Sequence, residues 1–254
     1  MSLSPMNLDD NPPDAAQPPR EQPDKAPPVI RPVDAAALVL VDRSRKTPRV
    51  LLGRRNASLR FMPDMLVFPG GRVDAVDRRV PVYGMLETES ERRLLARVTR
   101  PSAARARALA LAAIRETCEE AGLLVGTGEA GTPARLPEAW AAFGKAGLFP
   151  NLEALTFVAR AITPPRFARR FDTRFFLADL GHVGHRMENT VGPDAELVET
   201  GWFTFAEAKQ AQVPMITRAI LDEIEARLAG GNRPWQPVPF YFTRGGRACR
   251  ESIA

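Results

Sequence analysis

The chain has 254 residues, which is enough for one sizeable hydrophobic core, and its 44% content of hydrophobic residues is ordinary for a globular protein. The net charge of +5 comes from arginines spread along the chain, and neither a nucleic-acid motif nor an aromatic stacking pattern accompanies them, so no nucleic-acid partner is expected. No apolar run approaches the roughly 18 residues that span a bilayer, and the chain does not start like a secretory signal, so the sequence argues for a cytoplasmic protein without a membrane partner.

The first residues differ in composition from the rest. Residues 1–32 are rich in Pro, Asp and Gln and have almost no aromatic or β-branched residues before Val29. Such a segment cannot bury enough apolar surface to fold, so we predict a disordered, Pro-rich leader followed by a single domain over residues 33–254. Two strands joined by a hairpin loop are predicted to open that domain, at 33–41 and 49–55.

A pair of glycines interrupts the next extended segment, which covers residues 67–73. Gly70 and Gly71 follow Phe68-Pro69, and glycines let a ligand approach the backbone closely, as is expected beside phosphates.

The segment 78–107 is mostly polar. Thr88 followed by Glu91 is typical of a helix N-terminus and predicts a short helix over residues 92–98. This helix is either a flap over an active site or a helix on the surface, and the sequence does not choose between them.

A longer helix is predicted to begin at Ser102 and to end at Gly122. Successive residues of a helix lie about 100° apart, so Glu116, Glu119 and Glu120 share one side, and the opposite side is apolar. Carboxylates this close repel one another and need a counter-charge, for which Mg²⁺ or Mn²⁺ is suited by its preference for hard oxygen ligands. The alternative is an ordinary solvated helix face.

The remaining chain predicts further strands and helices by the periodicity of its apolar residues. The strands are expected at 123–125, 155–162, 171–178 and 196–203, the last of them closing the sheet, and the helices at 137–146 and 214–229. The tail, residues 230–254, is expected to pack as an extended segment or to pair with a second subunit, so a homodimer stays open. Cys118 and Cys249 make no disulfide framework, which fits a reducing compartment.

Residues 115–122, Arg-Glu-Thr-Cys-Glu-Glu-Ala-Gly, resemble the core of the Nudix box. The pattern of that family is Gly, five residues, Glu, seven residues, and then Arg-Glu-apolar-x-Glu-Glu-x-Gly-apolar. Arg115, the three glutamates and Gly122 match it, whereas Thr117 stands where an aliphatic residue is usual.

The first half of the pattern is present but displaced. Gly71 is followed after five residues by Asp77, where the family usually has Glu. The seven residues expected before Arg115 are replaced by a much longer stretch, so about thirty residues, 78–107, are inserted in the motif. The role of Asp77 is therefore open, and similar insertions occur in the coenzyme A diphosphatase branch of the family.

A second segment resembles the coenzyme A signature of that branch, Leu-Leu-Thr-x-Arg-Ser, three residues, Arg, three residues, Gly, three residues, Phe-Pro-Gly-Gly. The agreeing residues are Leu51, Leu52, Arg55, Arg60 and Phe68 to Gly71, and the departures are Gly53, Asn56 and Asp64. Guanidinium groups suit phosphate oxygens, so Arg55 and Arg60 are expected to contact the substrate.

The resemblance implies an α/β protein, a Nudix-type α/β/α sandwich with a mixed β-sheet. It implies a Mg²⁺-dependent (or Mn²⁺-dependent) hydrolase that cleaves the pyrophosphate of a nucleoside diphosphate linked to another moiety, with coenzyme A or acyl-CoA as the favoured small-molecule substrate. Dinucleotides, nucleotide sugars and a non-catalytic ligand-binding role are the alternatives.

The family's pattern also implies roles for the residues of the motif. Glu119 and Glu120 would hold the metal, Glu116 would act as ligand or base, and Arg115 would orient the glutamates. The backbone of Gly70 and Gly71 would line the site. A further base is expected from one of three residues, Glu188, Glu196 or Glu199.

Overall fold

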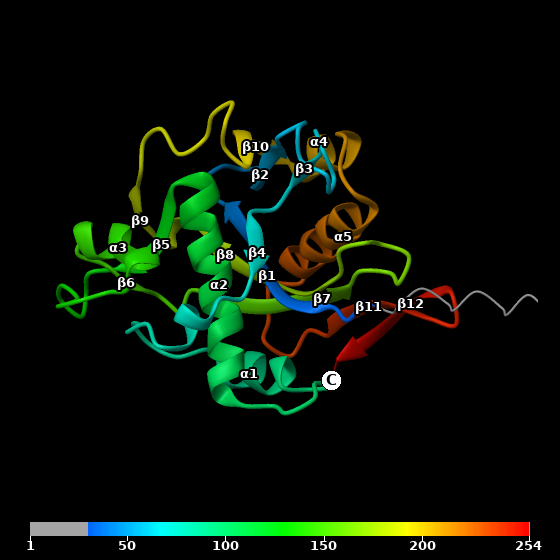
Figure 1. The fold of residues 1–254 in the computed structure, drawn as a ribbon, viewed down its shortest axis with the longest axis horizontal. Coiled ribbons are helices and arrows are strands. Elements are labelled where there is room, and N and C mark those ends of the chain that lie inside the picture. The colour runs from blue at the N-terminus through cyan, green and yellow to red at the C-terminus, as the bar shows by residue number, and fades with distance from the viewer. Residues whose placement is uncertain (1–29, 254) are drawn as a thin grey trace, which may run out of the picture.

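The computed structural model describes residues 30–253, and a nine-stranded mixed sheet with helices on both faces forms its core (Figure 1). The predicted α/β/α sandwich with a mixed sheet is thus confirmed. The predicted leader lies outside the described residues except for 30–32. No helix of the described part of the chain is long and apolar enough to cross a membrane.

The main path of the sheet has the order β10-β2-β1-β8-β7-β11-β12. Its strands are β1 (Val33–Asp42), β2 (Arg49–Arg55), β7 (Thr156–Ile162), β8 (Phe171–Asp179), β10 (Leu197–Thr204), β11 (Val238–Arg244) and β12 (Arg247–Ile253). The β1–β8 and β11–β7 pairs are parallel, and the other neighbours on the path are antiparallel, which makes the sheet mixed.

The prediction that residues 196–203 form the last strand is wrong. The tail adds the β11–β12 hairpin to the edge of the sheet, where β11 lies parallel to β7. The tail does pack as an extended segment, because its apolar side chains Val238 and Phe240 are buried in the same cluster as the long helix.

Short strands from the glycine segment fill a gap between β1 and β2. β3 (Leu66–Val67) pairs with the end of β2, and β4 (Gly70–Arg72) pairs with the beginning of β1. Between them the Pro69 carbonyl accepts a hydrogen bond from the Leu38 amide at 3.0 Å. The two glycines are therefore part of the sheet and not of a free loop.

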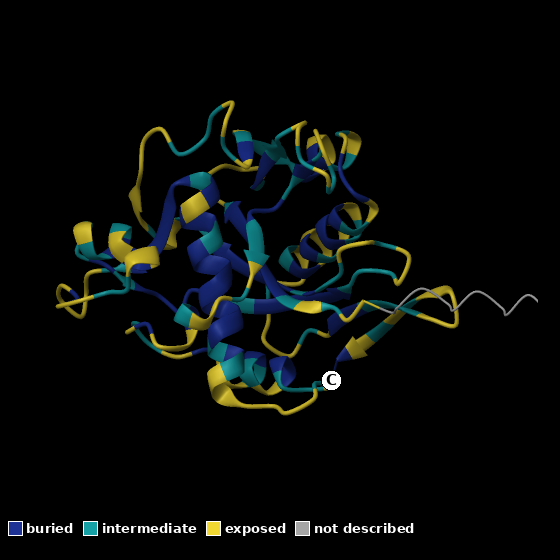
Figure 2. Cartoon of the chain, in the orientation of Figure 1, coloured by how far each residue is buried: buried dark blue, intermediate teal, exposed yellow. Residues whose placement is uncertain are grey.

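The glutamate-bearing helix is α2 (Ala103–Ala121), with the bounds that its sequence predicts. The Ser102 side chain accepts from the Arg105 amide at its N-terminus, and Gly122 ends it with φ of 67°, a left-handed conformation that favours glycine. Most of α2 is buried (Figure 2), because Leu109, Leu111 and their neighbours pack on one face of the sheet.

The other face of the sheet is covered by α4 (Phe205–Gln210) and α5 (Met215–Ala229). A second, three-stranded sheet continues from the end of α2. Its strands are β5 (Leu123–Thr127), β6 (Phe149–Pro150) and β9 (Val183–Arg186), and the short helices around it are η2 (Glu138–Trp140), α3 (Ala141–Lys145) and η3 (Leu180–His182).

The helix predicted at 92–98 is found four residues earlier, as α1 (Thr88–Leu94). Its cap is Glu87, whose carboxylate accepts from the amides of Glu89 and Ser90, so the Thr88-x-x-Glu91 pattern misplaced its beginning. Figure 1 shows α1 beside the first turns of α2, at the end opposite to the glutamates. α1 therefore does not lie over the glutamates, and its Leu94 packs in the same buried cluster as α2.

A buried network of charges fixes the strands at the beginning of β1 and β8. Asp172 makes a bidentate pair with Arg160 at 2.8 and 2.7 Å and also contacts Arg174 at 3.1 Å, and all three residues are buried. Arg174 reaches Asp34 of β1 as well, at 2.9 Å. Such a network resists the loss of one partner, because the charges that remain are desolvated.

We expect Asp172→Ala to lower the free energy of unfolding by about 3–5 kcal/mol, since it leaves Arg160 buried without a carboxylate and Arg174 with Asp34 alone. In a chain of this size the midpoint of thermal unfolding should fall by on the order of 10 °C. Arg43→Ala is the matched control, because its pair with Asp179 has an Arg43 side chain that is 54% exposed and should contribute less than about 1 kcal/mol. Equal melting temperatures of the two variants would contradict the assigned role of the network.

Candidate active site

Arg115 is the centre of a group of charges on the last turns of α2. Its Nε and Nη2 donate to the two carboxylate oxygens of Asp77 at 2.9 and 3.1 Å, and Nη2 also donates to the Arg72 carbonyl. Its Nη1 donates to Glu116 at 2.9 Å and to Glu119 at 3.0 Å. Burial alone would lower the pKa of Arg115, but the bond to Asp77 and the surrounding carboxylates raise it above its usual range.

Asp77 is completely buried, and the structure gives it a definite place. It lies in η1 (Ala75–Arg78), where its side chain accepts from the Asp74 amide at 2.8 Å while Asp74 caps the same turn. The bidentate contact with Arg115 joins this turn to α2 across the polar segment between them. The long stretch between Asp77 and Arg115 therefore leaves their geometry intact.

Glu120 is the most enclosed of the three glutamates, with only 8% of the residue exposed. One of its oxygens accepts from the Gly70 amide at 2.9 Å. Burial raises its pKa to about 8; the hydrogen bond from Gly70 and the charge of Arg55 oppose this, whereas Glu196 and Glu116 add to it. The ionised form of Glu120 thus lacks sufficient counter-charge from the protein.

Glu116 lies against the second glycine of β4. A Cβ atom on Gly71 would come within 2.4 Å of the Glu116 carboxyl carbon, so only glycine leaves room for this carboxylate. Burial raises the pKa of Glu116, and Glu119 and Glu196 raise it further, while Arg115 opposes the shift. Glu119, by contrast, has a side chain that is 45% exposed.

Arg55 is brought to the edge of this group, and Arg60 is not. On β2, Leu51 packs on the α2 face of the sheet and Leu52 on the α5 face, so the alternation of a strand puts Arg55 on the α2 face. Its charge acts on Glu120, and its Nη1 contacts Glu196 at 2.8 Å. Arg60 is exposed, in the turn that follows β2, and makes no ion pair among the described residues.

Of the three glutamates expected to supply a further base, Glu196 lies nearest to the site. Its charge affects both Glu116 and Glu120. Glu199 pairs instead with Arg54, at 2.6 Å, and the alternation of β2 places Arg54 on the opposite face. Glu188 is exposed in the turn after β9.

The donor set fits a hard divalent cation in its chemistry. Glu116 and Glu120 are enclosed carboxylates that flank Gly70 and Gly71, and burial without a full counter-charge is what a bound cation relieves. Within residues 30–253, however, no three acidic, His or Cys side chains converge closely enough to hold an ion as they stand. Glu119 is engaged by Arg115 and would have to turn to take part.

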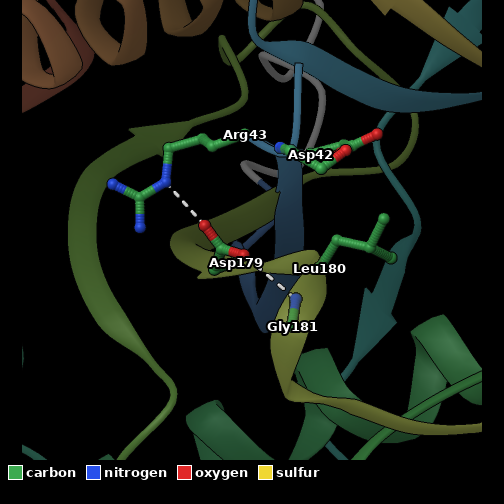
Figure 3. A pocket seen from close by; sticks show the side chains of 6 residues that line it. Asp42, Arg43, Asp179, Leu180 and Gly181 are labelled. Carbon is green, nitrogen blue, oxygen red and sulfur yellow. Dashed lines mark hydrogen bonds and ion pairs between the residues drawn. The ribbon is translucent and has the colours of Figure 1, made fainter.

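A hollow of about 510 Å³ lies at the carboxyl ends of β1 and β8, away from the glutamates (Figure 3). Its acidic residues are satisfied locally: Asp42 accepts from the Ser44 amide, and Asp179 accepts from the Gly181 amide and from Arg43. None of the α2 glutamates lines it, so we assign it no part in the site.

Cys118 has no chemical role in this arrangement. It is buried on the apolar side of α2, as its place in the sequence predicts, and burial raises the pKa of its thiol to about 12.

Two contacts of the site have no clear signal in the sequence. The Asp77–Arg115 pair joins residues 38 positions apart, and the Arg55–Glu196 pair joins the end of β2 to the residue that precedes β10. Arg55 itself was expected, and the alternation of Leu51 and Leu52 could have favoured it over Arg54.

No family model matches the chain, and no curated protein matches it in sequence. Among solved structures it is similar to a Nudix hydrolase from Alicyclobacillus acidocaldarius, with 29% identity and a TM-score of 0.55 over 76% of this chain and 90% of that one. Two further solved structures are more distant. A Nudix hydrolase from M. Smegmatis has 16% identity and a TM-score of 0.40 over 78% of this chain and 87% of that one. A C. elegans Ap4A hydrolase has 18% identity and a TM-score of 0.41 over 78% of this chain and 98% of that one.

The first of these similarities carries the assignment. It extends over 76% of this chain and 90% of that hydrolase, and the α/β/α arrangement with a mixed sheet that the resemblance implies is present in the structure. The chain therefore has the fold of the Nudix hydrolases and is an enzyme of this type, acting on phosphorus-containing anhydrides.

Proposed function

We propose that this protein is a Mg²⁺- or Mn²⁺-dependent pyrophosphohydrolase that cleaves a nucleoside diphosphate linked to another moiety. The observation that carries the proposal is that Glu116 and Glu120 lie against the backbone of Gly71 and Gly70, with Glu119 held beside Glu116 by Arg115 and with Arg55 close enough for its charge to act on Glu120. Hydrolysis of a diphosphate by water needs neutralisation of charge and positioning more than covalent chemistry, and these residues supply both.

Each residue of the motif has a role in this proposal. Glu116, Glu119 and Glu120 would hold the divalent cation, which when bound neutralises phosphate charge and lowers the pKa of water. Arg115 keeps Glu116 and Glu119 in place and is itself fixed by Asp77. The Gly70 amide fixes one oxygen of Glu120, and so leaves the other available.

Arg55 is the proposed contact for the substrate's phosphate. It is 14% exposed, lies on the glutamate face of the sheet, and keeps its charge at every physiological pH. A permanent cation at this edge offsets part of the repulsion between the glutamates and an incoming diphosphate.

Coenzyme A or an acyl-CoA is the substrate we favour within this class. The support is the agreement of Leu51, Leu52, Arg55 and Phe68 to Gly71 with the coenzyme A signature, together with the insertion that we place inside the Nudix box at 78–107. The intact Asp77–Arg115 pair supports this placement, because it joins the two halves of the motif on either side of the insertion.

A hydrolysis screen across coenzyme A species, dinucleotides and nucleotide sugars, with and without Mg²⁺, tests the function. We expect Mg²⁺-dependent release of a nucleoside 5′-monophosphate, or of adenosine 3′,5′-bisphosphate and a phosphopantetheine from coenzyme A, and a loss of kcat/KM on the order of 100-fold or more in Glu120→Gln. No turnover of any diphosphate would contradict the enzyme proposal, whereas turnover unchanged in Glu120→Gln would contradict the site. Turnover of other diphosphates with coenzyme A untouched would remove only the favoured substrate.

The two glycines should respond differently to alanine. In Gly71→Ala the new Cβ meets the flexible end of Glu116, so we expect a stable protein whose kcat/KM falls by about 10- to 100-fold because this carboxylate is displaced. In Gly70→Ala the new Cβ meets the backbone of Ala36 and Ala37 within 2.5–2.6 Å, and we expect a loss of about 3 kcal/mol or more in stability. Thermal unfolding measures the stability of both variants, and steady-state kinetics measures their kcat/KM. A Gly71→Ala enzyme with the kcat/KM of the wild-type protein would argue against a role for Glu116.

Stabilisation by Mg²⁺ should increase with pH. The pKa of Glu120 is about 8 in the folded protein against 4.5 as its ordinary value, so its contribution to stability is complete below about pH 4.5 and is lost as pH rises to about 8. Mg²⁺ binds the ionised form, so the shift in melting temperature between Mg²⁺ and EDTA should be larger at about pH 8.5 than at about pH 6.

The same measurement on Glu120→Gln is the control for this pH dependence. This variant has no proton to exchange at position 120, so its Mg²⁺ shift should be smaller and should depend less on pH. A shift that is independent of pH in the wild-type protein would contradict the assignment of Glu120 as a ligand.

A further inference from the structure

Residues 187–196 connect the end of the glutamate helix with the strand that carries Arg55. At one end, the Met187 amide donates to the Gly122 carbonyl at 2.7 Å, directly after α2. At the other end, the main-chain and side-chain amides of Asn56 donate to three carbonyls at 2.7–3.1 Å, those of Pro193, Ala195 and Glu196. Both ends of the segment are therefore fixed to elements of the site.

The side chain of Glu196 is less constrained than its backbone. It is 50% exposed, and its carboxylate contacts Arg55 at 2.8 Å. Arg55 is the more fixed partner, since its side chain is 14% exposed and its Nε donates to the Phe61 carbonyl at 3.0 Å. A rotation of the Glu196 side chain is thus enough to break the pair while Arg55 keeps its position.

Glu196 also occupies a donor of the Arg55 guanidinium that an anionic substrate would bind. The Nε of Arg55 donates to a carbonyl, so a bidentate contact with a phosphate would use the Nη1–Nη2 edge, and Glu196 occupies Nη1 of that edge. A phosphate that binds both nitrogens therefore competes with the Glu196 carboxylate for Nη1. Glu196 in addition adds negative charge beside Glu116 and Glu120, which opposes the approach of a diphosphate.

We propose that the Arg55–Glu196 pair is an exchangeable latch, in which Glu196 holds the anion-binding edge of Arg55 and a phosphate group of the substrate displaces it. The inference rests on the proposed function, since it takes Arg55 as the contact for a diphosphate. Glu196 then lowers the affinity for substrate as a competitor, while the bond from the Arg55 Nε to the Phe61 carbonyl keeps Arg55 in its binding geometry. Asn56 keeps the backbone of Glu196 in place during the exchange.

Calorimetric titration with α,β-methylene adenosine diphosphate in the presence of Mg²⁺ tests the latch, because the P–C–P bridge of this probe is not hydrolysed. Glu196→Gln removes the competitor, and we expect it to bind the probe about two- to fivefold more tightly than the wild-type protein, as the loss of a partly exposed ion pair implies. A purely structural role for Glu196 predicts the opposite sign, because the variant would then bind more weakly.

Glu199→Gln is the matched control. Glu199 pairs with Arg54, the neighbour of Arg55 on β2, at 2.6 Å and on the opposite face of the sheet, and the variant removes the same charge. We expect its affinity to equal that of the wild-type protein. A gain in Glu199→Gln as large as that in Glu196→Gln would overturn the latch in favour of a general charge effect.

A double-mutant cycle completes the test. In an Arg55→Gln background, Glu196→Gln should give no gain, because there is no guanidinium to release; a gain that persists there overturns the proposal. Arg55→Met, which also removes the cation, replaces Arg55→Gln if the latter does not fold. Wild-type binding of the probe with unchanged affinity in Glu196→Gln overturns the latch alone, whereas a wild-type protein that neither binds the probe nor hydrolyses any diphosphate overturns the proposed function with it.

Discussion

The buried guanidinium of Arg115 is the interaction on which the site depends. It contacts Asp77, Glu116 and Glu119 simultaneously. It is stable in a buried position because these carboxylates compensate the free energy that desolvation of the guanidinium costs. It joins the turn that follows the glycine strand to the helix that carries the glutamates. Without it, Asp77 would be left as a fully buried charge, and the two glutamates would repel each other without an internal counter-charge.

Two further arginines join separate segments of the chain where the polar segment after Asp77 contacts the tail. Arg93 of α1 and Arg227 of α5 donate to main-chain carbonyls between Arg233 and Pro237, and so hold the loop that leads into β11. α1 and the loop before the β11–β12 hairpin are therefore fixed to each other. These contacts anchor the segment between Asp77 and Arg115 at a place away from the glutamates.

The sequence predicted the fold to the extent that its signals are local. α2 was predicted with its ends because Ser102, the apolar periodicity and Gly122 all lie within one segment. β11 was missed because Pro239 weakens its pattern and because its partner, β7, lies far away in the chain. α1 was misplaced because Glu87, rather than Thr88, provides the cap, and two adjacent polar residues give nearly the same pattern.

The sequence predicted which residues form the candidate site better than it predicted which of them contact one another. Glu116, Glu119 and Glu120 follow from helical spacing alone, and Arg55 follows from the alternation of β2. The place of Asp77 could not be read from the chain, since the residues between it and Arg115 obscure the spacing on which the motif depends. The same holds for Glu196, which meets Arg55 only because Asn56 fixes the end of its segment.

The balance of charge in the finished site explains why these contacts belong together. Five carboxylates, those of Asp77, Glu116, Glu119, Glu120 and Glu196, face two guanidinium groups, those of Arg55 and Arg115. Burial raises the pKa of Glu120 to about 8, and the charges of Glu196 and Glu116 add to the shift, so protonation is favoured on a carboxylate that would hold the proposed cation. A diphosphate that arrives before a cation meets a net negative surface, with Arg55 already engaged by Glu196. A divalent cation held by Glu116, Glu119 and Glu120 would lower this repulsion and favour the competition of a phosphate with Glu196 for Arg55, so the proposed function predicts that the binding of metal and of substrate are coupled through the same carboxylates.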